Sequence, residues 1–229
     1  MSARSVPSDS ASIVGRTREL AQLQAALARA SDGQGRLVLI SGEAGIGKTT
    51  LVRELMRRAE AADTLTLRGG CYDLSITPPF GPWTELFSTF SDTEHVHLTA
   101  PRLLHSDQAA TALQDPVTLF NTVRDFLTDA AASQTVVLIL EDVHWSDQAS
   151  LDLLRFVARQ LAALRVLMVI TYRDDEVTRR HPLFQMLPLL VREAEAVRLE
   201  LQRLTPSAVH DLVRGYALSE PDARRLATY

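Results

Sequence analysis

The chain has 229 residues, and 46% of them are hydrophobic, which is enough to bury one core of ordinary to large domain size. The 24 basic and 28 acidic residues give a formal net charge of −4, which argues against a surface that coats nucleic acid, because phosphate binding draws on clustered positive charge. No apolar stretch approaches the ~18 residues of a membrane span, and the single cysteine, Cys71, can form no internal disulfide, so we expect a cytoplasmic protein.

The amino-terminal part is predicted to be a leader followed by one helix. Residues 1–12 are rich in serine and alanine and lack the apolar segment of a signal peptide, so we expect a disordered leader. After residues 13–16, apolar side chains recur at helical spacing up to Ala30. The polar cluster at 31–35 contains two glycines and ends this helix, since glycine is the usual residue past a helix carboxyl end.

Five apolar runs of strand length predict the sheet. They lie at residues 37–40, 64–67, 135–140, 166–170 and 197–201. The first four do not alternate with polar residues, a pattern typical of parallel strands that are covered on both faces. Helical patterns at about 48–61, 117–131 and 150–164 lie between them. This alternation predicts an α/β protein with a doubly wound, mostly parallel, five-stranded sheet.

Three segments are less regular. Residues 78–90 are predicted to form a loop leading into a helix on the edge of the sheet, and residues 91–115 a surface insert. Thr205 and Pro206 start a helix, with threonine as the N-cap and proline at the first helical position, and residues 219–222 start another. We therefore expect a leader at 1–12, one domain at 13–204 and the start of a following helical module at 205–229.

The first candidate site lies between the first strand and the helix after it. Residues 42–49 match the pattern G-x-x-x-x-G-K-[ST] of a P-loop, whose glycines let successive N–H groups point at a phosphate beside a helix amino terminus. Lys48, the only lysine in the chain, can bridge the β- and γ-phosphates, and the Thr49 hydroxyl suits Mg²⁺. The pattern predicts a site for ATP or ADP with Mg²⁺, formed by Gly42, Ala44, Gly45, Ile46, Gly47, Lys48, Thr49 and Thr50.

Two acids follow the apolar run 135–140. Glu141 and Asp142 would be costly at the end of a buried strand unless they met a cation or opened onto a cleft. In a P-loop protein we expect this strand beside the P-loop strand, where its acids can hold Mg²⁺ and orient the attacking water. The alternative role is a helix N-cap, which Asp147 fills better because it is closer to the next helix.

A third candidate, Arg173, follows the apolar run 166–170. At the carboxyl end of the sheet its guanidinium could reach a γ-phosphate. The alternative is a solvated arginine paired with Asp174 or Asp175. His144 and Trp145, directly after the acids, are predicted to serve packing, because a lone histidine is not a metal site.

With these pieces assembled, the chain resembles the ATPase domain of STAND-type regulators, especially the large ATP-binding LuxR-type transcription regulators. The resemblance runs from about Ile13 to the end of the chain and is carried by residues 13–20, 41–49, 68–71, 140–147 and 171–173. It implies that Val14, Gly15 and Arg16 lie near the adenine and that Arg173 is a sensor. It also implies a switch held by ADP or ATP, with weak ATPase activity.

The resemblance also implies partners outside this chain. Further domains of the same polypeptide would include a repeat-built sensor and a carboxyl-terminal DNA-binding module, so no direct nucleic-acid contact is expected from this segment. Such proteins place a Gly-x-Pro-type motif after the last helix, and its proline covers the nucleotide. No glycine follows Tyr216, so we expect a piece of a longer protein with a pocket open on the adenine side. P-loop ATPases generally carry Asp then Glu, whereas this chain has Glu141 then Asp142, so both acids remain candidates for the metal.

Two other functions stay open, and a third is excluded. A ring-forming AAA+ motor or loader would self-associate with nucleotide and supply an arginine across the interface, for which Arg179 or Arg180 is available. A small-molecule kinase would need an arginine-rich lid, and no compact one is visible. A GTP-specific switch is excluded, because its guanine-reading Asn-Lys-x-Asp motif needs a second lysine.

Overall fold

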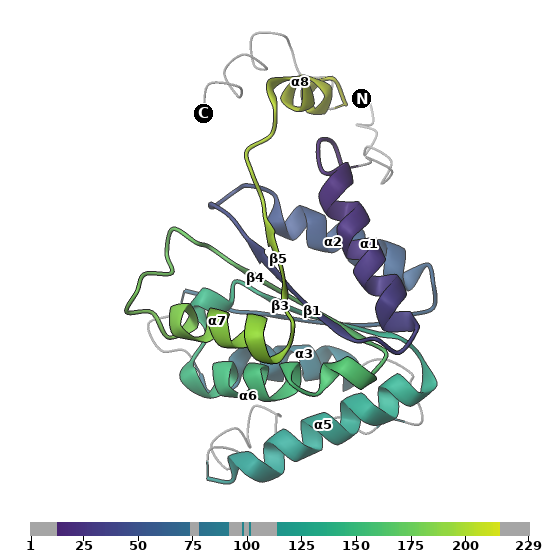
Figure 1. Ribbon diagram of the computed structural model, residues 1–229, viewed down its shortest axis with the longest axis vertical. Helices are drawn as coiled ribbons and strands as arrows, with labels where there is room; N and C mark the ends of the chain where they lie inside the picture. The colour runs from purple at the N-terminus through teal and green to yellow at the C-terminus, as the bar shows by residue number, and fades with distance from the viewer. Residues whose placement is uncertain (1–12, 74–77, 92–97, 99–100, 102–113, 216–229) are drawn as a thin grey trace, which may run out of the picture.

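The structure, a computed structural model, describes residues 13–73, 78–91, 98, 101 and 114–215 and shows a sheet with helices on both faces (Figure 1). All strand pairings are parallel, in the order β2-β3-β4-β1-β5, which confirms the predicted α/β class. The strands are β1 (Arg36–Ser41), β2 (Leu65–Gly70), β3 (Val136–Glu141), β4 (Val166–Tyr172) and β5 (Val197–Glu200). The predicted leader, most of the predicted insert and the helix start at 219–222 lie outside the described residues.

The helices divide between the two faces of the sheet (Figure 1). On one face lie α1 (Thr17–Ser31) and α2 (Lys48–Glu60). On the other lie α3 (Gly81–Ser91), α5 (Pro116–Ser133), α6 (Gln148–Ala158) and α7 (Pro182–Glu193), while α8 (Pro206–Gly215) follows β5. Successive side chains of a strand point to opposite faces of the sheet and therefore pack into different hydrophobic cores. Val38 and Ile40 pack with α1 and α2, and Leu37 and Leu39 pack with the helices on the other face.

The order of the strands corrects one expectation. The strand that carries the two acids, β3, does not lie beside the P-loop strand β1, because β4 lies between them. Val38 of β1 is in register with Val169 of β4, and Leu138 of β3 is in register with Met168 of β4. The expectation was wrong because a buried apolar run indicates that a strand is covered on both faces and does not identify its neighbours. The ends of β1 and β3 are therefore about 10 Å apart, two strand spacings, with the end of β4 between them.

Helix α7 was not among the predicted elements. His181 is its N-cap, with Nδ1 accepting the N–H of Leu183 at 3.1 Å, and Pro182 occupies the first turn, where a missing N–H costs nothing. The buried side chains Leu183, Met186 and Leu190 pack it onto the core. As predicted, α3 packs against the edge strand β2, and its Trp83 is fully buried.

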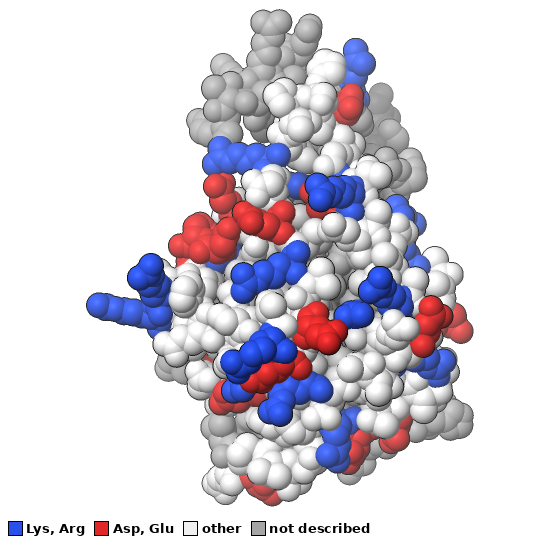
Figure 2. All heavy atoms as spheres, viewed as in Figure 1, with Lys and Arg blue, Asp and Glu red and all other residues white. Residues whose placement is uncertain are grey.

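Two further observations concern the surface. Basic and acidic side chains are interspersed over the face shown in Figure 2. Within the described part of the chain, none of the helices combines the length and the apolar character needed to cross a membrane.

Candidate functional site

The loop between β1 and α2 leaves open space in front of a helix amino terminus. Three of its glycines have positive φ angles: 148° at Gly42, 72° at Gly45 and 103° at Gly47, which immediately precedes α2. A Cβ atom built on Gly45 or Gly47 would meet no heavy atom within 4 Å. The backbone conformation, and not crowding, therefore requires glycine at these two positions. A phosphate group fits this open cradle, because backbone N–H groups and the helix dipole both favour an anion there.

Lys48 opens α2 with its ammonium group held by the loop itself. Its Nζ donates to the carbonyl oxygens of Gly42 at 2.7 Å and Glu43 at 2.9 Å, and the residue is buried. Burial lowers the pKa of Lys48, while the negative charge of Asp142 acts in the opposite direction. The chain's only lysine is thus fixed at the cradle, and its pKa responds to the charge of Asp142, the acid directly after β3. Thr49 follows it in the first turn of α2 and is partly buried.

Arg16 braces the P-loop from the amino-terminal side. The residue is buried, its Nη2 donates to the carbonyl oxygen of Ile46 at 2.8 Å, and its Nη1 donates to Glu19 at 3.2 Å. The guanidinium therefore holds the phosphate loop in place, a role that neither the residue pattern nor the resemblance suggested. Chain position alone could not reveal a contact across thirty residues.

Gly15 brings the amino-terminal segment against α8 and the residue Leu204 that precedes it. Its φ angle is 73°, and an added Cβ atom would lie 2.7 Å from Cβ of Ala208 in α8 and 2.8 Å from Cδ2 of Leu204. Only glycine permits this approach, because real Cβ contacts are not so short. Val14 beside it is partly buried. Residues 14–16 therefore lie between the P-loop and α8.

The two acids after β3 have different surroundings. Glu141 is buried and accepts from Nε of Arg68 on β2 at 2.5 Å. Asp142 has a left-handed backbone, with φ 55°, and is partly buried. Burial raises the pKa of Asp142, and the charges of Lys48 and Arg173 oppose that rise. Asp142 is therefore the acid whose charge acts on the P-loop lysine, while Glu141 is paired with Arg68 of β2.

Thr171 also belongs to this site, although it was not among the predicted site residues. It is buried near the end of β4, and its hydroxyl accepts the N–H of Asp142 at 2.9 Å. Because β4 lies between β1 and β3, this bond fixes the acid relative to the P-loop. The signal was present: a polar side chain at the end of a buried apolar run, the same signal that identified the two acids.

Arg173 is close to the site but already engaged. Its Nη1 forms an ion pair with Glu176, three residues on, and its guanidinium lies 4.8 Å from the centre of the Trp145 ring. Neither acid considered from the sequence, Asp174 or Asp175, is the partner in these pairs. Asp147 caps α6 by accepting the N–H of Ser150 at 2.9 Å, as the sequence predicted.

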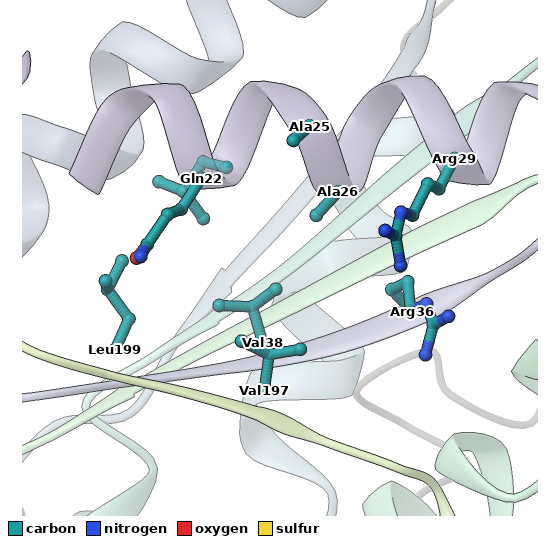
Figure 3. Close-up of a pocket in the computed structure, with 9 residues that line it drawn as sticks. Gln22, Ala25, Ala26, Arg29, Arg36, Val38, Val197 and Leu199 are labelled. Atoms are coloured by element: carbon teal, nitrogen blue, oxygen red, sulfur yellow. The ribbon is translucent and has the colours of Figure 1, made fainter. Parts of the chain in front are cut away.

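Two concavities lie at opposite ends of β1. One of about 340 Å³ opens at the P-loop and is lined by Gly42, Glu43, Ile46, Asp174, Glu200, Leu201, Gln202 and Arg203. The other, of about 210 Å³, is a mainly apolar groove between α1 and β5, with Arg29 and Arg36 toward one end (Figure 3). Its wall includes Val38, in the first half of β1, so it lies away from the phosphate cradle.

A bound Mg²⁺ would depend on the nucleotide for most of its ligands. Within the described ranges, no three histidine, cysteine or acidic side chains cluster tightly enough to hold a metal on their own. Mg²⁺ usually takes one or two protein oxygens together with phosphate oxygens and water. Thr49 and one of the two acids after β3 suit that arrangement.

The sequence profile of the AAA ATPase domain family matches residues 12–170. An uncharacterized protein of Rhizobium meliloti (strain 1021) is 30% identical over a region that covers 62% of this chain and 17% of that protein. The chain thus spans less than a fifth of the length of this curated relative.

Solved structures share the fold. Cdc6p from Pyrobaculum aerophilum is similar with a TM-score of 0.58 and 17% identity, over 93% of this chain and 52% of that one. AMPPCP-bound DnaA from Aquifex aeolicus gives 0.52 and 13%, over 93% and 56%. A STAND protein with a tetratricopeptide repeat sensor, from Pyrococcus horikoshii, gives 0.51 and 16%, over 90% and 27%.

Proposed function

The chain belongs to the AAA ATPase domain family, whose profile matches most of its length, and on that premise we propose that it is a regulatory switch that binds ATP and ADP. In this proposal the domain hydrolyses ATP slowly with Mg²⁺ and acts within a larger signalling or transcription regulator. P-loop ATPases use Mg²⁺ together with the phosphates of the bound nucleotide.

The observation that carries the proposal is the arrangement of three charges around the end of β4. Arg173 directly follows β4, and the N–H of Asp142 is bound to Thr171 of β4 at 2.9 Å. Strand β4 pairs with β1, whose loop leads to Lys48, and the charges of Asp142 and Arg173 both act on the pKa of that lysine. The open cradle of the P-loop lies next to Lys48. A triphosphate in that cradle would have a cation at its β- and γ-phosphates, an acid to orient water and an arginine within electrostatic reach.

Slow turnover is favoured by how these groups are engaged. Glu141 is ion-paired with Arg68, and Arg173 is ion-paired with Glu176, so neither is poised for chemistry before nucleotide binds. The shorter acid, Asp142, is left to orient the water. A switch needs long-lived nucleotide states, and slow hydrolysis supplies them.

Contacts that join the P-loop and the amino-terminal segment to α8 and the residues before it support the switch. Glu43 in the loop is ion-paired with Arg203 at 2.9 Å, and Gly15, next to the bracing Arg16, lies against Ala208 of α8. The bound phosphates would thus contact a loop that is tied to the segment leading into α8. The small share of the R. meliloti relative and of the STAND protein that the chain covers supports a place within a longer polypeptide.

The test is calorimetric titration of ATP, ADP and GTP with Mg²⁺. We expect binding of ATP and ADP in preference to GTP, and Lys48→Ala should remove most of it, because this substitution deletes the only ammonium group at the phosphates. The matched control is Arg53→Ala, which removes an exposed cation from the same helix and should leave both affinities unchanged. Equal affinities for the wild type and Lys48→Ala would reject the proposed function.

A second candidate is a self-associating AAA+ motor or loader. Arg179 and Arg180 are exposed between β4 and α7, in the segment that follows the end of β4, so they are available to a neighbouring copy. Nucleotide-dependent assembly on a sizing column, lost when both arginines become alanine, would favour this candidate. If the protein elutes as a monomer both with and without ATP, the motor is rejected and the regulatory switch remains.

A further inference from the structure

One carboxylate, that of Glu176, connects the two segments that flank the candidate γ-phosphate position. It forms an ion pair with Arg173, in the segment after β4. Its Oε2 accepts the indole N–H of Trp145 at 3.1 Å and lies 3.4 Å from Nε2 of the buried His144. His144 and Trp145 belong to the short 3₁₀ turn that directly follows Asp142. Glu176 therefore joins the segment that carries Arg173 to the turn that carries Asp142.

The position of Arg173 makes this connection relevant to nucleotide. Arg173 follows β4, which lies between the P-loop strand and the strand of the acids, and its charge lowers the pKa of both Lys48 and Asp142. The guanidinium is thus near the phosphate cradle. In the structure, however, Nη1 of Arg173 donates to the carboxylate of Glu176, and this donor must leave the carboxylate before it can bind a phosphate oxygen.

We propose that Glu176 is a positioning residue that holds Arg173 away from bound nucleotide until a γ-phosphate competes for the guanidinium, and that it thereby sets the preference for ATP over ADP. The inference rests on the proposed nucleotide-binding function and adds a regulatory group to the same site. Glu176 contacts no phosphate itself. It acts through Arg173.

The competition follows from charge and geometry. A γ-phosphate carries more negative charge than one carboxylate and offers several acceptor oxygens to the planar guanidinium, so it can displace Glu176. ADP ends at the β-phosphate, which the P-loop and Lys48 already bind, and so leaves the Arg173–Glu176 pair intact. When Arg173 leaves, Glu176 keeps its bond to Trp145, and the carboxylate is not stranded without a partner.

Glu176→Gln is the informative variant. The amide keeps an acceptor for the Trp145 indole but loses the charge that holds Arg173. A partly exposed ion pair is worth up to about 1 kcal/mol, so its loss should raise the affinity for a non-hydrolysable ATP analogue about fivefold, with little change for ADP. The matched control is Glu193→Gln, which breaks a comparable ion pair between α7 and Arg155 of α6, at 2.8 Å, away from the P-loop. Its ratio of ATP to ADP affinity should equal that of the wild type.

The arginine provides the second arm of the experiment. In an Arg173→Ala background, Glu176→Gln should no longer change the ATP to ADP ratio, because there is nothing left to release. A merely structural role for Glu176 would change both affinities together, or only the melting temperature, in either background. An unchanged or lower ratio in the Glu176→Gln single variant, or an equal rise in the Arg173→Ala background, overturns the inference.

Trp145 supplies an independent readout. Because its ring contacts the Arg173 guanidinium and its indole N–H is bound to Glu176, its fluorescence should change on binding of the ATP analogue but not of ADP. A Trp145→Phe variant identifies its contribution. An equal response to both nucleotides counts against the inference. If Lys48→Ala leaves all nucleotide binding unchanged, the proposed function fails. If the wild type binds nucleotide through Lys48 but Glu176→Gln leaves the ratio of ATP to ADP affinity unchanged, only the role of Glu176 is rejected.

Discussion

Replacing Arg16 with alanine separates two roles for this residue. The family resemblance placed Arg16 near the adenine, whereas the structure shows its Nη2 on the carbonyl oxygen of Ile46 in the P-loop at 2.8 Å. A hydrogen bond from a charged donor is worth about 1.5–3 kcal/mol. If the whole of that energy supports the loop conformation that binds phosphate, Arg16→Ala should weaken nucleotide binding about 10- to 100-fold.

The assay compares ATP with inorganic tripolyphosphate, which has the same phosphates and no base. Calorimetry should show the same factor of loss for both ligands, because a loosened P-loop harms phosphate binding whatever is attached to it. The control is Arg18→Ala, two residues on and exposed, which should change neither affinity. A loss for ATP alone, with tripolyphosphate affinity unchanged, would refute the loop-bracing role and return Arg16 to the adenine.

Two further predictions concern the acids and the buried histidine. Asp142→Asn should keep ATP binding but lower the rate of phosphate release at least about a hundredfold, because Asp142 orients the water. Glu141→Gln should mainly lower the melting temperature, because it removes the charge of the ion pair with Arg68. The reverse result would exchange the roles of the two acids. Burial lowers the pKa of His144 from 6.5 to about 4, so folding favours the neutral ring. The stability that this provides is fully present above pH 6.5 and is lost as the pH falls toward 4, by up to about 3 kcal/mol. Urea denaturation at pH 7 and pH 5 measures how much the free energy of unfolding falls between these pH values. The fall should be smaller for His144→Gln than for the wild type or for the control His210→Gln, whose histidine is exposed. An equal fall in all three proteins would contradict this prediction.

The apolar runs located all five strands to within a few residues, because strands that are covered on both faces must be apolar on both faces. The order of those strands was not accessible in the same way. The position of β4 between β1 and β3 depends on how the connecting helices pack. The composition of one apolar segment does not identify the strands beside it. Helix α7 was missed in a segment that carries Pro182 at its start and Pro188 within it, although the apolar spacing of Leu183, Met186 and Leu190 is helical.

The site could be predicted where chemistry is local in the sequence and not where it is distant. The P-loop is one continuous stretch, so its glycines, Lys48 and Thr49 could be named from the pattern. The bond from Arg16 to Ile46 and the pair between Glu141 and Arg68 join residues far apart in the chain, and only the fold brings them together. Glu176 is near Arg173 in sequence, but Asp174 and Asp175 are nearer. Residue type alone does not show which of the three acids forms the ion pair with Arg173.

The strand order also bears on how the protein is made. On the ribosome β1 emerges early, yet both of its neighbours, β4 and β5, are encoded in the last third of the described chain. Until they arrive, β1 has two unpaired edges in a nascent chain that already exposes apolar surface, a state prone to pairing with other chains. We therefore expect that the P-loop of the nascent chain at first lies apart from the two acids after β3 and from Arg173 after β4. Nucleotide would then begin to stabilise the domain only when β4 has joined β3 to β1.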